Sequence, residues 1–387
     1  MADTFLDDSF QIVVHHAHGQ VTRTEVHSRR ALETHQLLIG RGPEEVVRML
    51  PRLYPLGAKG HQTAALWALE EAYGLGVKAY HHRARALLVH LEIMTQTLTR
   101  LLADWPALLG KAPINAPLAA IETKLTQALY GDKEPFFFGE RSAQADLEMI
   151  SQVAAEMAQL LETHLLGYPP KIWASLTVEH LMAWVDDHPA LGAEVIRYYG
   201  QLPALKNPEI APLGWPSHQD WNQALTSPYA VEMIYLPELN GQKMETGAFA
   251  RQARNLQLKD YAARRANPLV LRLLGRLVDL CWQQSRLELG MELPAQGPGV
   301  QKKMGIGLAQ IESTRGRVVH RIEMAADKTR RYQLLSAAEW NFHPKGMVPL
   351  ALAGLVAKAD QISAAAAAWT RALDPFVRAP IKLVRDA

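Results

Sequence analysis

Cysteine is almost absent from this chain of 387 residues, which contains Cys281 and no other. A single thiol cannot form an internal disulfide, and it cannot supply the several thiolates of a structural zinc site or an iron–sulfur cluster. Cys281 falls on the apolar face of a predicted helix, where a buried and unreactive thiol is the usual outcome. A role as a metal ligand is the alternative.

The chain also lacks a marked excess of charge and any long apolar run. Its 41 basic and 39 acidic residues give a net charge of +2, so no strong field would attract nucleic acid or an anionic membrane. No apolar run approaches the ~20 residues of a membrane-spanning helix. The opening MADTFLDDSF is acidic, whereas a signal peptide is basic and then apolar. We therefore expect a cytoplasmic protein that binds no nucleic acid and has no stable membrane insertion.

Common catalytic motifs are missing as well. The sequence has no GxxxxGK[ST], HExxH or GxSxG pattern, which removes the usual signatures of nucleotide-binding proteins, zinc proteases and serine hydrolases. Gly305 and Gly307 lack the preceding strand and following helix that a phosphate-binding loop requires, so we interpret them as part of an ordinary loop.

What the sequence does contain is mostly helical periodicity. Apolar residues recur at helical spacing in four long segments, at about 80–105, 142–166, 267–281 and 348–373. Alternating patterns predict a hairpin at 10–28 and two further strands at 317–324 and 331–337, and residues 374–387 are expected to form a short tail. These patterns predict a mainly α fold with small β elements, in which a central antiparallel helix bundle carries β-hairpins near the N- and C-terminal ends.

One segment has the organisation of a functional site. Residues 30–73 are predicted to form a helix, a loop rich in proline and glycine at 51–60, and a second helix headed by His61. Loops held between rigid helices commonly present binding groups to a ligand.

Short motifs follow one another along the chain in a distinctive order. They are Arg30-x-x-Glu33, Gly40-Arg41, Pro43, Arg52, His61, Glu245-x-Gly247-x-x-Ala250-Arg251, Glu312-x-x-Arg315-Gly316, His320, Tyr332-Gln333, Trp340-Asn341, Pro344 and Asp374-Pro375. In this order and spacing they resemble the landmarks of the large subunit of nickel–iron hydrogenases. The resemblance covers nearly the whole chain and is weakest between 105 and 240.

The resemblance implies one large-subunit-like domain over residues 1–387. Its expected parts are an N-terminal hairpin at 1–28, motif helices at 29–105, an irregular and helical middle at 106–243, and C-terminal helices, hairpin and tail at 244–387.

In that family, nickel is bound by two motifs, each with two cysteines. The first reads Arg-x-Cys-Gly-x-Cys-x-x-x-His, and here Arg52 and His61 remain while Tyr54 and Gly57 stand in place of the cysteines. The second reads Asp-Pro-Cys-x-x-Cys-x-x-His. In this chain Asp374 and Pro375 remain, while Phe376, Ala379 and Lys382 stand in place of the two cysteines and the histidine. Soft thiolates cannot be replaced by a phenol, a hydrogen atom, a phenyl ring and a methyl group, so we expect no nickel and no hydrogen cleavage.

The family's iron, which carries two cyanides and one carbon monoxide, sits in a pocket built from other landmarks. Arg315 matches the arginine that hydrogen-bonds a cyanide, which suits a guanidinium beside an anionic ligand. Val318 matches an apolar position beside the diatomic ligands. Ala338 replaces the hydroxyl residue that contacts the second cyanide, so the resemblance implies a pocket that is only partly retained.

A large-subunit relative without nickel ligands resembles the HupK/HoxV type of hydrogenase expression/formation protein. The resemblance implies a scaffold, not an enzyme, that receives or holds the Fe(CN)₂(CO) fragment and passes it to the true large subunit. The implied partners are a small HypC-type maturation chaperone, the hydrogenase large subunit and other maturation proteins. Candidate iron ligands are Glu33, His61, Cys281 and Asp374, or a thiolate from the partner.

Two other functions are compatible with the motifs. One is a relative of the quinone-reactive subunit of respiratory complex I, in which His61 would line a quinone cavity. The other is a metal-free mimic of the large subunit that only binds maturation partners. In each case we expect the N-terminal loop and the C-terminal tail to meet at one end of the helix bundle.

Overall fold

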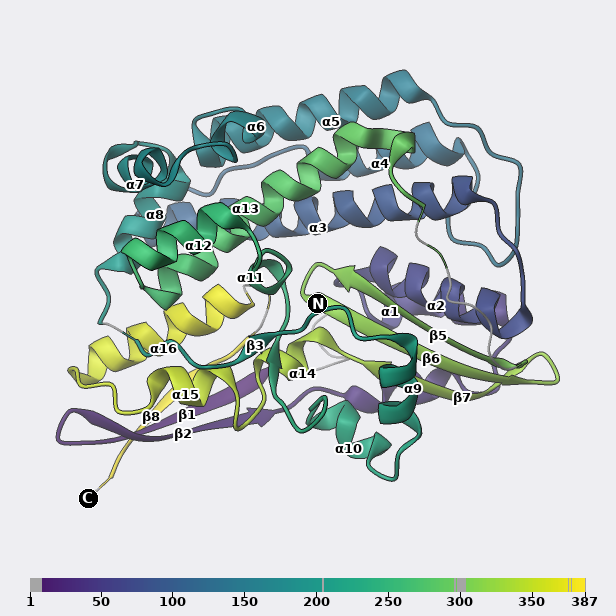
Figure 1. Cartoon of the computed structure of the whole chain (residues 1–387). Coiled ribbons are helices and arrows are strands. Elements are labelled where there is room, and N and C mark those ends of the chain that lie inside the picture. The colour runs from purple at the N-terminus through teal and green to yellow at the C-terminus, as the bar shows by residue number, and fades with distance from the viewer. Residues whose placement is uncertain are drawn as a thin grey trace.

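The computed structural model describes residues 9–203, 205–295, 297, 304–374, 376 and 378–386. The chain is mainly α-helical, with the long helices in an upper layer and two three-stranded sheets below them in the view of Figure 1. This confirms the predicted fold class, although the sheets are larger than the predicted hairpins.

The helical layer is built around two long helices, α3 (Ala79–Leu108) and α13 (Pro268–Leu289), which pack against each other. Around them lie α4 (Leu118–Tyr130), α5 (Leu147–Leu161) and α8 (Leu191–Gly200). The start of α13 follows from its sequence, because the Asn267 side chain accepts hydrogen bonds from the Leu269 and Val270 N–H groups and Pro268 needs no such partner. The segment predicted to begin at 142 starts later, at the cap Asp146.

The remaining helices are shorter. They are η1 (Leu32–Leu38), α1 (Pro43–Leu53), α2 (Ala58–Tyr73), η2 (Glu162–Leu166), α6 (Pro170–Trp173), α7 (Val178–Asp187), α9 (His218–Thr226), α10 (Ala230–Tyr235), α11 (Ala248–Arg251), α12 (Leu256–Arg264), η3 (Gly290–Glu292), α14 (Ala337–Asn341), α15 (Met347–Leu352) and α16 (Ala359–Leu373). The prediction of a single helix at 348–373 is therefore wrong, because α15 and α16 are two separate helices. Gly354 lies between α15 and α16 at φ +71°, a conformation that ends a helix.

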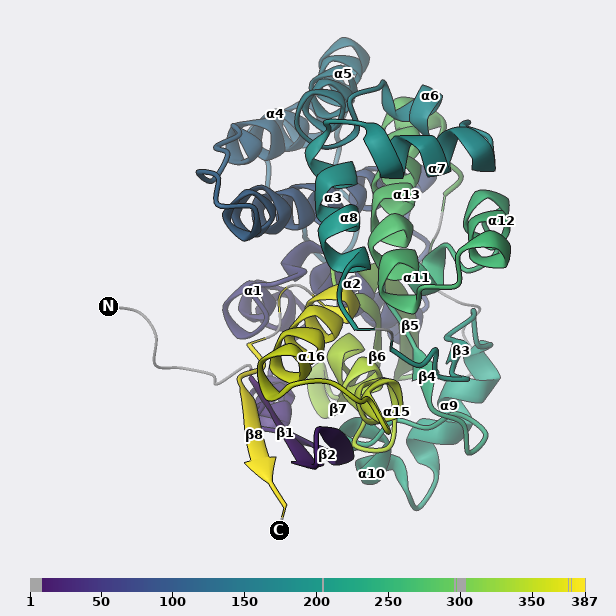
Figure 2. The ribbon, with the colours of Figure 1, turned by 90° about the vertical axis from the view of Figure 1, so that its left-hand side faces the viewer.

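The first sheet joins the two ends of the chain. Strands β1 (Phe10–Ala17) and β2 (Gln20–Ser28) form the predicted hairpin through His18 and Gly19, whose φ values of +49° and +79° suit a tight hairpin turn. Strand β8 (Ile381–Arg385) runs parallel to β1 on its other side (Figure 2). The expectation of a simple C-terminal tail is thus wrong, because part of that segment is a strand.

The second sheet contains β5 (Ile306–Ser313), β6 (Gly316–Ala325) and β7 (Lys328–Leu335) in antiparallel order. The sequence predicted a loop at Gly305 and Gly307 and no strand over 308–313, so strand β5 was missed. Helix α2 packs so closely on this strand that a Cβ at Gly307 would lie 1.7 Å from the Ala68 carbonyl oxygen. Gly307 therefore permits close packing and is not a loop residue.

A third, very small sheet pairs β3 (Ala211–Pro212) with β4 (Met244–Glu245). No helix in the described part of the chain combines the length and apolar character needed to cross a membrane. The site discussed below lies where the α1–α2 loop, the β5–β6 turn and the end of α16 meet.

Candidate functional site

The loop between α1 and α2 is tied to the β5–β6 turn through helix α3. The Gly57 N–H donates to Gln96 Oε1 on α3 at 3.1 Å, and the Thr314 hydroxyl donates to the same oxygen at 2.7 Å. A Cβ at Gly57 would lie 3.4 Å from the Cβ of Ser313, so loop and turn are in direct contact. Two segments more than 250 residues apart are thereby held together at the predicted site.

Arg315, in that turn, forms a buried ion pair with Asp374 at the end of α16. Its Nε donates to Asp374 Oδ2 at 2.6 Å, and the two side chains are 8% and 0% exposed. The other oxygen, Oδ1, accepts the Phe376 N–H at 2.9 Å. Arg276 of α13 donates to the Ala372 carbonyl at 2.8 Å and so fixes the end of the same helix. Both carboxylate oxygens of Asp374 are therefore in use within the protein.

His61 lies in the first turn of α2, beneath the ring of Tyr54. The two rings stack at 4.7 Å with an angle of 22° between their planes. Burial, together with the charges of Arg30 and Arg315, lowers the pKa of His61 to about 3, so the imidazole is neutral near pH 7. Burial also raises the pKa of Tyr54. The Tyr54 hydroxyl is buried and has no hydrogen-bond partner in the described part of the chain.

Arg30 lies next to this site and is held by α14 and the residue before it. Its Nη1 donates to Glu339 Oε1 at 2.7 Å and to Ser336 Oγ at 2.8 Å. Glu33 follows in the same motif but is exposed, and it accepts a hydrogen bond of 2.7 Å from the Tyr235 hydroxyl. In this motif Arg30 therefore points into the protein, whereas Glu33 lies on the surface.

The landmark motifs of the C-terminal half pack around the β5–β6 turn. The Asn341 side chain bonds both backbone groups of Thr246, at 2.9 and 3.1 Å. Gly247, at φ +102°, lies against this turn, and a Cβ there would be 3.1 Å from the Arg315 carbonyl oxygen. Arg251 forms a bidentate ion pair with Asp279 at 2.9 and 2.6 Å. These motifs therefore support the backbone that positions Arg315.

The structure brings most of the predicted site residues together. Contacts connect Tyr54 and Gly57 with His61, and Asp374 with Arg315 and Phe376. The bonds of Gln96 to Gly57 and to Thr314 join these two groups, and the charge of Arg315 lowers the pKa of His61. Val318 is buried in β6, Ala338 is buried in α14, and Ala379 is half-buried before β8. Pro375 lies outside the described residues.

Cys281 is placed apart from this group. It lies in the middle of α13 within the main apolar core, and burial raises the pKa of its thiol, which keeps it protonated. Among the residues that the structure describes, no group of three or more His, Cys, Asp or Glu side chains is arranged to hold a metal ion.

Several supporting residues were missed by sequence reasoning. Gln96 and Glu92 of α3 both accept hydrogen bonds from the start of the α2 segment. The signal for Glu92 was present, because a carboxylate at this position falls on the apolar stripe of the helix, four residues after Leu88. His320 and Tyr332 belonged to the motif series, but the contact of His320 with His61 depends on long-range packing.

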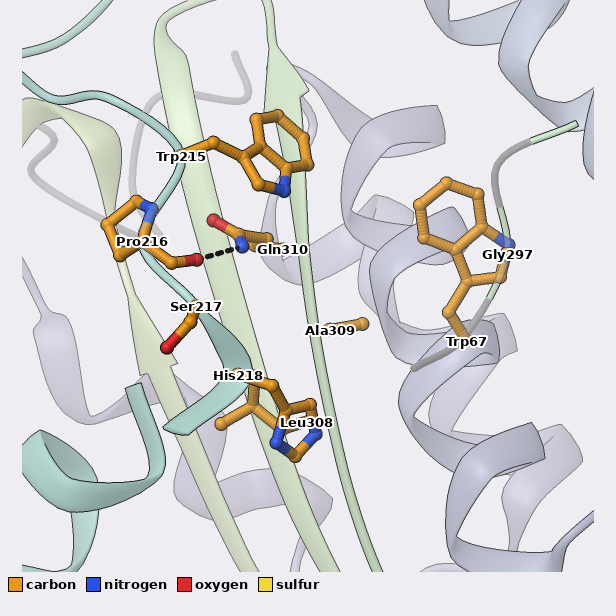
Figure 3. A pocket seen from close by; sticks show the side chains of 9 residues that line it. All are labelled: Trp67, Trp215, Pro216, Ser217, His218, Gly297, Leu308, Ala309 and Gln310. Atoms are coloured by element: carbon orange, nitrogen blue, oxygen red, sulfur yellow. Dashed lines mark hydrogen bonds between the residues drawn. The ribbon is translucent and has the colours of Figure 1, made fainter. Parts of the chain in front are cut away.

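A separate pocket of about 480 Å³ lies between α2, β5 and the loop before α9 (Figure 3). Trp67 and Trp215 are on opposite sides of it, and Gln310 donates to the Pro216 carbonyl at 2.7 Å (Figure 3). The exposed Trp215 ring has the Arg317 guanidinium 3.9 Å from its centre. None of the residues that line the pocket is a predicted site residue.

Comparisons with known proteins agree with the resemblance drawn from the motifs. No family model matches the chain. The hydrogenase expression/formation protein HupK of Azotobacter vinelandii is 26% identical over 381 residues, covering 95% of this chain and 96% of the relative. The hydrogenase expression/formation protein HoxV of Cupriavidus necator is 27% identical over 344 residues, covering 83% and 82%.

Solved structures show the same relation at the level of the fold. The nickel–iron–selenium hydrogenase of Desulfovibrio vulgaris Hildenborough in the reduced state superposes with a TM-score of 0.62 at 16% identity and covers 93% of this chain and 94% of its own. The enzyme of Desulfomicrobium baculatum gives 0.61 at 14% identity with the same coverage. The chain is therefore a relative of the HupK/HoxV hydrogenase expression/formation proteins, and it has the fold of the large subunit of nickel–iron hydrogenases.

Proposed function

We propose that this protein acts in the maturation of a nickel–iron hydrogenase as a scaffold without catalytic activity. It would receive or hold the Fe(CN)₂(CO) fragment and pass it to the true large subunit. The names of its relatives support a role in maturation. The observation that carries the scaffold role is that Arg315 stays buried and oriented by Asp374 although the adjoining cysteine position holds Phe376.

The replaced ligand positions argue against nickel. Tyr54, Gly57, Phe376 and Ala379 offer no thiolate, and nickel in this family is bound by four. A protein with this site would hold the iron fragment at a stage before nickel is added.

The charge of the site suits a ligand that carries cyanide. Arg315 and Arg30 both lie near enough to His61 to affect its pKa. The Nε–H bond to Asp374 fixes the plane of the Arg315 guanidinium, and so the directions of its other N–H groups. Charge-assisted hydrogen bonds are strong in a buried site, because little water competes for the donors.

The iron fragment needs ligands that a partner protein would have to supply. Cyanide and carbon monoxide fill three positions of a six-coordinate iron, and the described residues offer no cluster of three donors for the rest. A thiolate from a HypC-type chaperone would supply a ligand that this chain lacks. The same observation favours, as a second candidate, a metal-free mimic that only binds maturation partners.

Replacing Arg315 by leucine tests the scaffold role. If the guanidinium bonds a buried cyanide, Arg315→Leu should weaken cargo retention by about 1–3 kcal/mol. The readouts are iron content and the infrared bands of cyanide and carbon monoxide after anaerobic purification, with circular dichroism to check folding.

A matched control is Arg41→Gln, because Arg41 pairs with Glu45 on the surface, where both side chains are largely exposed (47% and 40%). This variant should retain iron like the wild type. Equal bands and equal iron in folded Arg315→Leu protein would show that Arg315 does not bind the cargo.

A further inference from the structure

Three buried side chains from α2, β6 and β7 form a continuous hydrogen-bonded chain behind Tyr54. Nδ1 of His61 lies 3.0 Å from Nε2 of His320, and Nδ1 of His320 lies 2.6 Å from the Tyr332 hydroxyl. His320 and Tyr332 are on the same face of the sheet, because Tyr332 pairs with Ile322, two residues beyond His320. Each ring nitrogen of His320 is therefore in use.

The positions of the hydrogen atoms follow from counting donors. Each of the two contacts holds one hydrogen atom, and a neutral imidazole carries a proton on only one nitrogen. His320 is 0% exposed and, among the described residues, its two nitrogens contact only His61 and Tyr332, neither of which is a carboxylate, so a charged imidazolium would have no counter-ion there and the ring is neutral. It therefore either accepts from Tyr332 and donates to His61, or accepts from His61 and donates to Tyr332.

The second arrangement leaves a donor unpaired. The Tyr332 hydroxyl would have to donate to another group, and the part of the chain that the structure describes gives it no partner besides His320. A buried O–H without an acceptor is unfavourable. The first arrangement also leaves one donor over, the Nε2–H of His61, but this nitrogen is not among the fully buried polar atoms without a partner in the described chain. The first arrangement is therefore favoured, because its leftover hydrogen is at the site, within reach of water or a ligand, and not sealed inside the sheet.

We propose that Tyr332 and His320 are positioning residues that hold His61 as the tautomer with its proton on Nε2. The lone pair on Nδ1 accepts the hydrogen bond from His320, so His61 keeps no nitrogen with which to ligate iron. Its Nε2–H has no acceptor among the described residues. His61 enters the site as a hydrogen-bond donor and not as the iron ligand that its residue type suggests.

The surroundings of His61 indicate what it donates to. The stacked Tyr54 brings a second buried donor without a partner among the described residues, and Arg30 and Arg315 bring positive charge. This set suits a small anionic ligand whose end atom accepts hydrogen bonds, such as the nitrogen of a metal-bound cyanide. The identity of that ligand rests on the proposed function. The tautomer depends only on this chain.

Nuclear magnetic resonance of the histidine rings tests the tautomer directly. The full-length protein, labelled with ¹⁵N-histidine and produced in cells without hydrogenase maturation, carries no cargo. The His61 signals, assigned by their loss in His61→Gln, should show a protonated Nε2 and an unprotonated Nδ1. Tyr54→Phe is the matched control, because it removes a nearby hydroxyl outside the chain of three, and it should leave the tautomer unchanged.

Tyr332→Phe should convert the single tautomer of His61 into a mixture, because His320 then loses the donor that fixes its own proton. A proton on Nδ1 of His61 in the wild type would overturn the proposal, as would an unchanged single tautomer in folded Tyr332→Phe. If that variant fails to fold, the wild-type spectrum alone decides. The scaffold function is tested by a different experiment. Absence of cyanide and carbon monoxide bands in protein from cells with maturation intact would contradict the scaffold function without affecting the tautomer.

Discussion

The motif resemblance aligns Gly57 with a cysteine of the family's nickel site, and the backbone at this position favours glycine. Its φ of +72° lies in the left-handed region, which costs other residues roughly 1–2 kcal/mol. We predict that Gly57→Ala lowers the free energy of unfolding by about 1–2 kcal/mol. The new Cβ would lie 3.4 Å from the Cβ of Ser313 and 3.6 Å from its Oγ, which are ordinary contact distances, so the cost comes from the backbone. Urea unfolding measures it.

Gly76→Ala is the matched control for this substitution. Gly76 has open space around its Cβ position and is not in the left-handed region. Its replacement should change the free energy of unfolding by less than about 0.5 kcal/mol or stabilise slightly. Equal effects at the two positions would contradict the backbone argument.

Motif order predicted the site residues better than donor type did. Motif order pointed to Arg315 and Asp374, whose side chains meet across 59 residues of sequence. Cys281 was chosen by donor type alone and Glu33 by donor type within the first motif, and the structure places the first in the core and the second on the surface. The contact of His61 with His320 spans 259 residues, and no local pattern encodes such a contact.

The start of helix α2 is held by a carboxylate from α3. Glu92 is 2% exposed and accepts the N–H groups of Lys59 and Gly60 at 2.9 and 3.1 Å. Burial raises the pKa of Glu92 to about 7, although the charge of Lys59 acts in the opposite direction. An acid with a raised pKa in the folded state binds its proton more tightly there than in the unfolded chain.

This pKa predicts a pH dependence of stability. The contribution of Glu92 is fully present below about pH 4.5 and is lost as the pH rises through about 7. Between pH 5 and pH 8, wild-type protein should therefore lose up to about 3 kcal/mol relative to Glu92→Gln. Urea unfolding of both proteins at the two pH values measures this, and the comparison cancels the contributions of the histidines. Parallel pH profiles would contradict the prediction.

Elements with strong local signals were predicted well, and those that depend on distant partners were not. Helix α13 begins where the sequence predicted a helix to open, at Asn267-Pro268. Strand β5 was missed because Gly307 is required by the approach of α2 and not by the strand itself. Strand β8 was missed because its partner β1 lies at the other end of the sequence.

At the scale of the whole molecule, the fold brings distant segments to one place. The α1–α2 loop contacts the β5–β6 turn, and Arg315 in that turn binds Asp374 at the end of α16. The C-terminal strand β8 continues from there to lie beside β1 (Figures 1 and 2). The chain thus has the fold of the hydrogenase large subunit, and the segments that meet here include those in which the motif resemblance places other residues at the four cysteine positions.

Infrared spectroscopy combined with metal analysis tests the central proposal most directly. The protein should be purified anaerobically, together with its chaperone, from cells in which hydrogenase maturation is intact. The scaffold function predicts substoichiometric iron, stretching bands of cyanide and carbon monoxide, and no bound nickel. Iron-free protein without those bands, purified with the chaperone still bound, would contradict it and leave the metal-free mimic.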